Sequence, residues 1–350
     1  MKVSVIITAH NRRRYLKQAI ESVLQQSPSI PYEIIVVKNF EDEEIDTFMA
    51  KKGVISILCN EQNVGEMLAA ALRVSSGDII SFLDDDDLFY PEKLKIVVGQ
   101  FIAHKELVYY HNGKVYIDSE GKLMAHREKG LQYAAYGTRF FIDPKARPSI
   151  KTLMILNPGA NNSSISIRRE LVFGHLEELR SIRACLDTFI YTLSLASGDL
   201  LEHDLRPLTK YRVHTENTGS AKIFMNMDEY MRERRSILEI VVRDWKRMLE
   251  VMERVDKYGV ATEVLRSYLT LYQMSKHINE GESKALILKE YIRALRAGYL
   301  WNYTVYSASL VSVRALSYAL LPKRIVDKLR SLRAVQLYNR NIRRIYLAQS

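Results

Sequence analysis

The chain of 350 residues has only two cysteines, Cys59 and Cys185. They could form one disulfide at most, and they match no metal-ligand spacing, so we predict free thiols in a reducing compartment. The sequence also lacks a glycine-rich dinucleotide fingerprint after its first predicted strand, and it lacks a P-loop lysine motif. Neither a dinucleotide cofactor nor a P-loop NTPase is therefore indicated.

Long apolar runs are missing as well. Residues 1–8 are too short for a secretory signal and predict a first strand instead. Residues 300–321 lean apolar, but they contain Asn302, Arg314 and several serines, which disfavours a membrane span. With 47% hydrophobic residues the chain can bury a sizeable core, and its length favours two folding units. We expect a cytoplasmic protein.

The net charge of +10 lies mostly in the tail, where residues 322–350 carry eight lysines and arginines against Asp327. Such a tail can attract nucleic acid or an anionic membrane surface, or it can be a soluble basic helix. We find no nucleic-acid module and predict no nucleic-acid partner. Because the tail follows residues 300–321 directly, a helix lying on the inner membrane face fits it; a helical bundle packed on the rest of the protein fits equally well.

The first part of the chain alternates short apolar runs with amphipathic helical patterns, which is typical of an α/β protein with a parallel sheet. Strands are predicted at residues 3–8, 32–37, 54–58 and 78–83, and helices at 14–26, 42–51 and 66–74. Ligands collect at the carboxyl edge of such sheets. The residues that follow the first, second and fourth strands should therefore converge on one crevice.

Four consecutive aspartates, Asp84 to Asp87, stand directly after the fourth predicted strand. Like charges at one strand end repel each other unless a cation neutralises them, and carboxylate oxygens suit Mg²⁺ or Mn²⁺. A solvated acidic turn is the alternative.

From about residue 221 the pattern changes to long helices, at 231–255, 261–279 and 284–299. We predict two domains: an α/β domain over residues 1–220 and a helical, basic extension over residues 221–350.

Several segments together resemble family 2 glycosyltransferases with the GT-A fold. They are Val3-Ser4-Val5-Ile6-Ile7-Thr8-Ala9-His10-Asn11-Arg12, residues 33–37, Asn63-Val64-Gly65, residues 76–87 and Pro91, with a looser match through Asp187 to residues 211–214. The resemblance implies a mostly parallel α/β sheet with flanking helices. It also implies an inverting hexosyltransferase that uses Mn²⁺ or Mg²⁺. The donor would be a nucleotide-diphosphate sugar, a UDP-sugar first of all, and the acceptor a hydroxyl of a glycan, polysaccharide or lipid-linked intermediate.

By position, Asp84 and Asp86 match the family's Asp-x-Asp motif, and Asp86 is our first choice of metal ligand. The resemblance adds Asp84 and His214 to the metal ligands; Asp85 or Asp87 could instead be solvated or cap the next helix. The residues expected at the donor or nucleotide are Thr8, Ala9, His10, Asn11, Arg12, Asn39, Gly65, Asp84, Asp85 and Arg212.

Asp187 matches the family's catalytic base, which takes the proton of the acceptor hydroxyl. An ordinary first-turn acid or N-cap is the alternative. Asn161 and Asn162 lie in a turn-rich loop where relatives line the acceptor side. For Arg212 and His214, the alternative to phosphate or metal binding is a solvated strand edge.

Three positions depart from the family pattern. Lys38-Asn39 replaces an Asp-Asp pair, and His10 replaces an aromatic residue, so recognition of the nucleobase does not follow from the family pattern. Asp42 or Glu41 could supply the missing carboxylate, although both also suit the start of a helix. Leu186 replaces the glutamate before Asp187. Lys38-Asn39 and Leu186 keep a catalytically silent scaffold homologue open as an alternative function. A sugar nucleotidyltransferase, which also combines an α/β sheet with metal-binding carboxylates, is the second alternative.

Overall fold

The computed structural model describes residues 1–61, 63–124, 139–150, 152–153, 159, 161–214, 227–280, 283–296 and 325. The chain divides into two compact units. The first unit comprises Met1–Arg147, Pro158–Arg212 and Val251–Ala261, and the second comprises Pro148–Asn157, Val213–Glu250 and Thr262–Ser350. The domain boundary at residue 220 stays a prediction.

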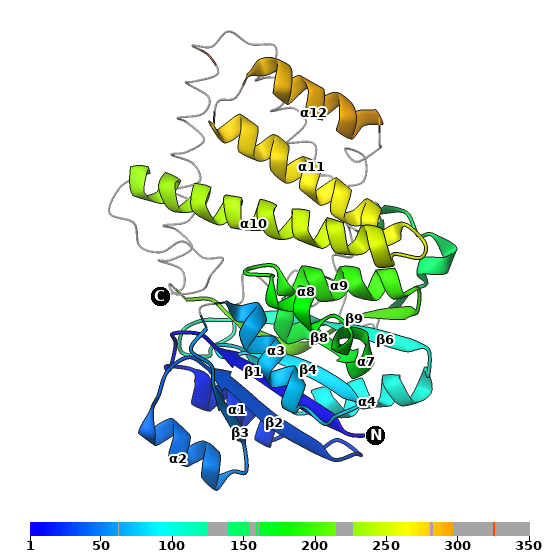
Figure 1. The fold of residues 1–350 in the computed structure, drawn as a ribbon. Helices are drawn as coiled ribbons and strands as arrows, with labels where there is room; N and C mark the ends of the chain where they lie inside the picture. Colours follow the sequence, from blue (N-terminus) through cyan, green and yellow to red (C-terminus); the bar gives the residue numbers. More distant parts are fainter. Residues whose placement is uncertain are drawn as a thin grey trace. The chain divides into compact units, whose positions relative to one another are not determined.

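The first unit is built on a nine-stranded sheet (Figure 1). Its parallel part has the order β3-β2-β1-β4. These strands are β1 (Val3–Ala9), β2 (Tyr32–Lys38), β3 (Ile55–Leu58) and β4 (Ile79–Asp84). The four strands and their parallel pairing were predicted from the alternating pattern, and both are confirmed.

The rest of the sheet is mixed. β8 (Ile165–Arg168) lies antiparallel between β4 and β6 (Leu107–Ile117). β9 (Leu200–Arg212) runs parallel to β6, while β5 (Leu88–Phe89) and β7 (Arg139–Ile142) pair antiparallel with β9. The sheet is thus parallel only in part, because the strict strand-helix alternation that imposes parallel pairing ends after β4.

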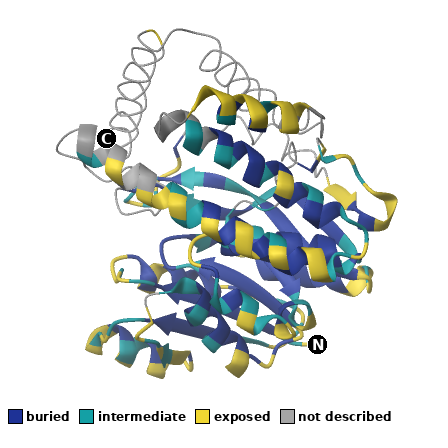
Figure 2. Ribbon diagram, turned by 45° about the horizontal axis from the view of Figure 1, so that its top comes forward, coloured by how far each residue is buried: buried dark blue, intermediate teal, exposed yellow. Residues whose placement is uncertain are grey.

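Helices cover both faces of the sheet around β1, and every residue of β1 is buried (Figure 2), whereas β3 at the edge of the sheet is largely exposed. Val3, Val5 and Ile7 belong to one core cluster with the apolar faces of α1 (Leu16–Leu24) and α4 (Lys93–Ala103). The opposite face of the strands contacts α3 (Val64–Val74). This two-sided burial explains why the strands read as continuous apolar runs.

Short polar caps begin two helices of the first unit. Asp42 precedes α2 (Glu43–Lys51) and accepts a hydrogen bond from the Ile45 amide at 3.1 Å, and Asn63 precedes α3 and accepts one from the Gly65 amide at 3.0 Å. Asp42 is therefore an N-cap here. The remaining helices of this unit are α7 (Arg169–Phe173), α8 (Leu176–Arg180) and α9 (Leu186–Ser197), with short 3₁₀ turns η2 (Pro144–Ala146) and η3 (Asn162–Ser164).

In the described part of the chain, three helices follow the sheet: α10 (Met227–Val255), α11 (Val260–Glu280) and α12 (Lys284–Arg296). They confirm the predicted helical patterns. Within the second unit the Trp245 ring packs against Tyr268 and Tyr272, with ring centroids 4.2 and 5.3 Å away. No helix among the described residues combines the length and the apolar character needed to cross a membrane. The predicted surface helix at 300–321 and the basic tail, apart from residue 325, lie outside the described residues.

Candidate active site

The carboxyl ends of three parallel strands meet at one edge of the sheet. In the register, Thr8 of β1 lies beside Asp84 of β4, and Ala9 lies beside Lys38 of β2. The segments that follow these strands start side by side, as predicted.

The aspartate run forms a compact cluster. Carboxylate oxygens of Asp84, Asp86 and Asp87 lie within 4.8 Å of one another. Asp85, Asp86 and Asp87 are only 2%, 4% and 0% exposed. The alternative of a solvated turn is therefore wrong, and so is helix capping by Asp87, because Glu92 precedes α4.

Burial and mutual repulsion raise the pKa of several of these carboxyl groups. The pKa of Asp84 rises to about 6, chiefly through burial and then through the neighbouring Asp86. Burial raises the pKa of Asp85 to about 8 although Arg12 opposes the shift, and burial with Asp86 and Asp84 nearby raises that of Asp87 well above its usual range. The cluster is thus short of positive charge.

Arg12, from the loop after β1, supplies part of that charge. Its guanidinium contacts both oxygens of Asp85, at 2.5 and 3.2 Å, and one oxygen of Asp86 at 2.7 Å. Arg12 was predicted at the donor site. The structure places it on the aspartates, where a two-pronged guanidinium fixes the carboxylates in orientation; donor contact stays a prediction.

Arg212, at the end of β9, is completely buried. Its guanidinium donates to the backbone oxygen of Asp86 at 2.8 Å and to Gln18 Oε1 at 2.8 Å. Its backbone amide donates to Asp87 Oδ1 at 2.8 Å. These bonds hold the aspartate loop in place, so Arg212 has a structural role here. Its contact with the donor phosphate stays a prediction.

A second carboxylate lies across the same space. Asp187 is in the first turn of α9 and accepts hydrogen bonds from the amides of Thr188 at 2.7 Å and Asn161 at 3.1 Å. The neighbouring Asn162 donates to Asp84 Oδ1 at 3.3 Å. Two consecutive asparagines therefore connect the predicted base to the predicted metal cluster.

Asn161 has φ +82°, a conformation that residues other than glycine rarely adopt. Its unusual backbone turns the amide toward Asp187 while Asn162 faces Asp84. Burial raises the pKa of Asp187, partly offset by those amide hydrogen bonds and by Lys114.

In the segments that follow β1 and β2, Asn11 and Asn39 form a reciprocal pair. The backbone amide of Asn11 donates to Asn39 Oδ1 at 2.8 Å, and Asn39 Nδ2 donates to Asn11 Oδ1 at 2.9 Å. His10 Nδ1 lies 3.3 Å from Asn11 Nδ2. The Asn39 oxygen still has a second lone pair for a nucleobase, and base contacts by His10 and Asn39 stay predictions.

Several other predicted site residues lie in the packed interior of the fold. Thr8 and Ala9 are buried within β1. A Cβ on Gly65 would lie 2.3 Å from the carbonyl oxygen of Leu179, so this glycine lets α3 approach that backbone. His214 belongs to the second unit, and its metal role stays a prediction.

Three residues at the site escaped the sequence analysis. Ser163 Oγ accepts from the Asp84 amide at 2.9 Å. Lys93 of α4, fully buried, donates to the backbone oxygen of Ser163 at 2.5 Å and so supports that contact. Lys114 of β6 interacts electrostatically with both the aspartate cluster and Asp187. None of them lies in a motif, so only the tertiary contacts reveal them.

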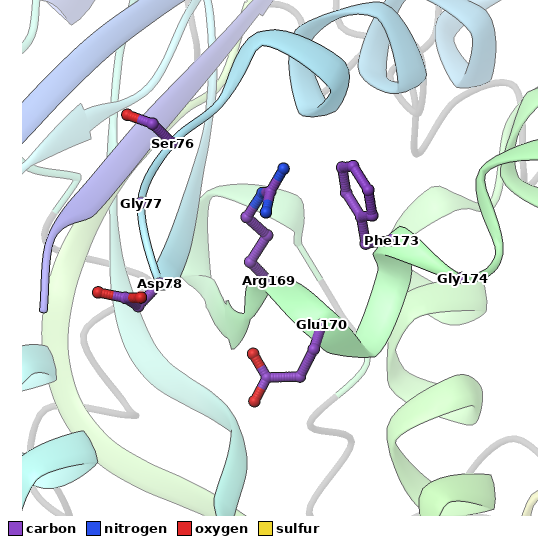
Figure 3. A pocket seen from close by; sticks show the side chains of 7 residues that line it. All are labelled: Ser76, Gly77, Asp78, Arg169, Glu170, Phe173 and Gly174. Carbon is purple, nitrogen blue, oxygen red and sulfur yellow. The ribbon is translucent and has the colours of Figure 1, made fainter.

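A separate cavity of about 310 Å³ lies at the opposite edge of the sheet, near the start of β4 (Figure 3). Asp78 and Glu170 line it, and the Arg169 guanidinium stacks on Phe173 at 4.0 Å. Since β4 carries Asp84 at its other end, this cavity is no part of the aspartate site.

The residues of the cluster fit a hard divalent cation. Three carboxylates converge within reach of one ion. The raised pKa values of Asp84 and Asp87 indicate that a positive charge beside them would be favourable. Asp84, Asp86 and Asp87 are therefore the candidate ligands. Asp87 joins the predicted pair, whereas Asp85 is occupied by Arg12.

Comparison with known proteins agrees with this geometry. Residues 4–161 match the family model described as glycosyl transferase family 2. An uncharacterized glycosyltransferase of Rickettsia bellii is 31% identical over 233 residues, covering 65% of this chain and 31% of the relative. Another from Haemophilus influenzae is 31% identical over 122 residues, covering 34% of this chain and 41% of the relative. The chain thus spans about a third of the length of the Rickettsia relatives.

Among solved structures, residues 1–349 of Staphylococcus aureus TarS superpose with a TM-score of 0.55 at 13% identity. The superposition covers 97% of this chain and 92% of the TarS fragment. At that identity the likeness concerns the fold.

Proposed function

We propose that the protein is a family 2 glycosyltransferase, which transfers a sugar from a nucleotide-diphosphate sugar to an acceptor hydroxyl, with inversion. The match of residues 4–161 to the family model, the similarity to uncharacterized glycosyltransferases and the GT-A fold of the sheet support this proposal. The observation that carries the proposal is the connection of two carboxylate sites through Asn161 and Asn162. One site suits a metal with its diphosphate and the other suits a base. An inverting glycosyl transfer of this kind uses both, with the base and the leaving diphosphate on opposite sides of the reacting carbon.

Asp84, Asp86 and Asp87 would hold Mn²⁺ or Mg²⁺, which offsets the charge that develops on the departing diphosphate. The protein's own contribution is to fix the three ligands. Arg12 orients Asp86, Arg212 holds the loop, and Ser163 takes up the amide of Asp84. Preorganised carboxylates of this kind need no rearrangement when the donor arrives.

Asp187 would act as the general base. It takes the proton of the acceptor hydroxyl while that oxygen forms a bond to the anomeric carbon. The bond from this carbon to the phosphate oxygen breaks, and its electron pair leaves with the diphosphate. Hydrogen bonds from two backbone amides favour the ionised form that a base requires, while burial brings its pKa closer to neutral.

For the donor we propose a UDP-sugar. TarS has been solved with UDP and with UDP-GlcNAc, at TM-scores of 0.54 and 0.52, so the shared fold can accommodate this donor class. The acceptor would be a hydroxyl of a glycan or of a lipid-linked intermediate. The basic segment at residues 322–350 would then bring the enzyme to the anionic inner membrane face where such lipids lie.

Thermal unfolding with a panel of UDP-, GDP-, dTDP- and CDP-sugars, each with and without Mn²⁺, tests the proposal. A bound ligand must raise the melting temperature. We expect one nucleotide to stabilise the wild type only with metal, and Asp86→Ala to lose the effect. If no nucleotide sugar stabilises the wild type, the donor site is absent and a silent scaffold is the better description.

Asp187→Asn then tests the chemistry separately. This variant should bind the donor as the wild type does but transfer sugar about 10²–10⁴-fold more slowly, because only the base is lost. Glu177→Gln, on the exposed surface of α8, is the matched control and should transfer normally. Full activity of Asp187→Asn would exclude this residue as the base.

A further inference from the structure

Lys114 is a cation of the active site that no motif indicates. It lies in β6 opposite Thr209 of β9, just after a register shift at Gly113. Gly113 has room for no side chain, since a Cβ would lie 2.3 Å from the carbonyl oxygen of Leu205. The close approach of the two backbones at Gly113 therefore fixes the position of the next residue, Lys114, in the strand.

The surroundings of the Lys114 ammonium are unusual. Its Nζ lies 4.7 Å from the centroid of the Tyr211 ring. Within the described part of the chain, no oxygen accepts a hydrogen bond from it and no carboxylate lies within ion-pair distance. Burial lowers its pKa, while Asp87, Asp187 and Asp84 oppose that shift. A partly buried ammonium with three donors to satisfy is unfavourable unless an acceptor reaches it.

The carboxylates around Lys114 indicate which acceptor that would be. The Lys114 ammonium interacts electrostatically with Asp84 and Asp87 of the metal cluster and with Asp187, the predicted base. In the proposed reaction the diphosphate lies at the cluster and the acceptor at Asp187, so the transferred sugar occupies the space between them. The strand register agrees with such a position, because Thr209, the partner of Lys114 in β9, donates a hydrogen bond to the backbone oxygen of Ser163 at 2.9 Å, next to Asn162.

We therefore propose that Lys114 is a substrate-binding residue that donates hydrogen bonds to oxygen atoms of the transferred sugar and so contributes to the choice of sugar. This inference rests on the proposed function. A contact with the diphosphate itself is the competing assignment. The two differ in one measurable respect: a sugar contact affects the nucleotide sugar alone, whereas a diphosphate contact affects the free nucleoside diphosphate equally.

The test compares binding of two probes to Lys114→Met: the nucleotide sugar that best stabilises the wild type in the panel, and its own nucleoside diphosphate, both with Mn²⁺. A hydrogen bond to a charged donor corresponds to about 10- to 100-fold in affinity. We expect affinity for the nucleotide sugar to fall by about 10-fold or more, while affinity for the nucleoside diphosphate changes by less than about twofold. Lys114→Arg keeps a cationic donor and should recover part of the loss.

Lys105→Met is the matched control, because this lysine is exposed just before β6 and far along the strand from the site. It should bind both probes normally. Equal weakening of both probes by Lys114→Met would assign the residue to the diphosphate, and unchanged binding of both would remove it from the donor site. If the wild type binds and transfers while Lys114→Met matches it, this inference alone fails; if the wild type binds no probe, the proposed function fails with it.

Discussion

Replacing Arg212 by methionine should destabilise the first unit strongly, because this one side chain connects four separate parts of the chain. Its guanidinium donates to the backbone oxygen of Asp86 and to Gln18 Oε1 at 2.8 Å, and to the backbone oxygens of Asp118 and Ser119 at 3.2 Å. It also lies over the Tyr15 ring, 4.2 Å from the centroid. Methionine fills a similar volume but donates no hydrogen bond.

The expected loss follows from the acceptors left behind. A buried acceptor without a partner costs about 1–3 kcal/mol, and two of the four bonds are short. The cation–π contact adds about 1–2 kcal/mol. Removing the buried charge also removes its desolvation penalty, which offsets part of this loss. We therefore expect the free energy of unfolding to fall by about 4 kcal/mol. For a domain of this size that corresponds to a melting temperature lower by roughly 8–16 °C.

Thermal and urea unfolding of the metal-free protein, followed by circular dichroism, measure this loss. Arg73→Met is the control, since Arg73 pairs with Glu177 at 3.1 Å on the surface and should change stability by less than about 1 kcal/mol. Arg212→Lys keeps the charge without the planar fork and should fall between the two, which also covers the case in which Arg212→Met does not fold. If Arg212→Met were as stable as Arg73→Met, the guanidinium would not be what holds the aspartate loop.

Two shorter predictions concern the backbone and the pH. Gly65→Ala should lower the free energy of unfolding by about 3 kcal/mol, because its Cβ would lie 2.3 and 2.5 Å from the carbonyl oxygens of Leu179 and Ile182. Gly99→Ala, inside α4 with open space around it, should instead raise the free energy of unfolding by about 0.5–1 kcal/mol. Equal effects of the two variants on urea unfolding would contradict the packing argument. The pKa of Asp84, about 6 in the fold against about 4 in the unfolded chain, means that the native state binds more protons between these values. The metal-free protein should therefore lose stability as the pH rises from about 4 to about 6, and Mn²⁺ should raise the melting temperature more at about pH 8 than at about pH 5; an increment independent of pH would exclude the carboxylates as ligands.

The parallel half of the sheet could be predicted from the sequence because its signals are local. Each strand is an apolar run that ends in polar residues, and each helix repeats apolar residues at helical spacing. Asp84 was found in the same way, at the end of a strand. Asp187 was assigned from the resemblance to the family, and its position in the first turn of a helix did not by itself indicate a base. Their neighbourhood was not predictable from spacing, since 103 positions of chain separate them and only the loop at Asn161 and Asn162 connects them.

The parts that the sequence analysis missed depend on long-range contacts. The order of β8, β6 and β9 follows from how strands pair across the sheet, and no short pattern encodes it. Lys114 and Lys93 stand among ordinary strand and helix residues, so composition gives them no role. Arg212 was found as a motif residue, yet its burial against Gln18, almost the whole first unit away along the chain, became visible only in the structure.

The contacts of Arg12 resolve an ambiguity that four aspartates in a row create. A run of identical residues offers several equivalent matches to a metal motif, and no spacing argument can separate them. Arg12 contacts both oxygens of Asp85 and one oxygen of Asp86, which removes Asp85 from the candidates. Asp87 is held through one oxygen by the Arg212 amide, and Asp84 through its own amide by Ser163. The three aspartates that converge are therefore those that Arg12 does not hold through both oxygens, and three such carboxylates within reach of one ion suit a cation shared with a diphosphate.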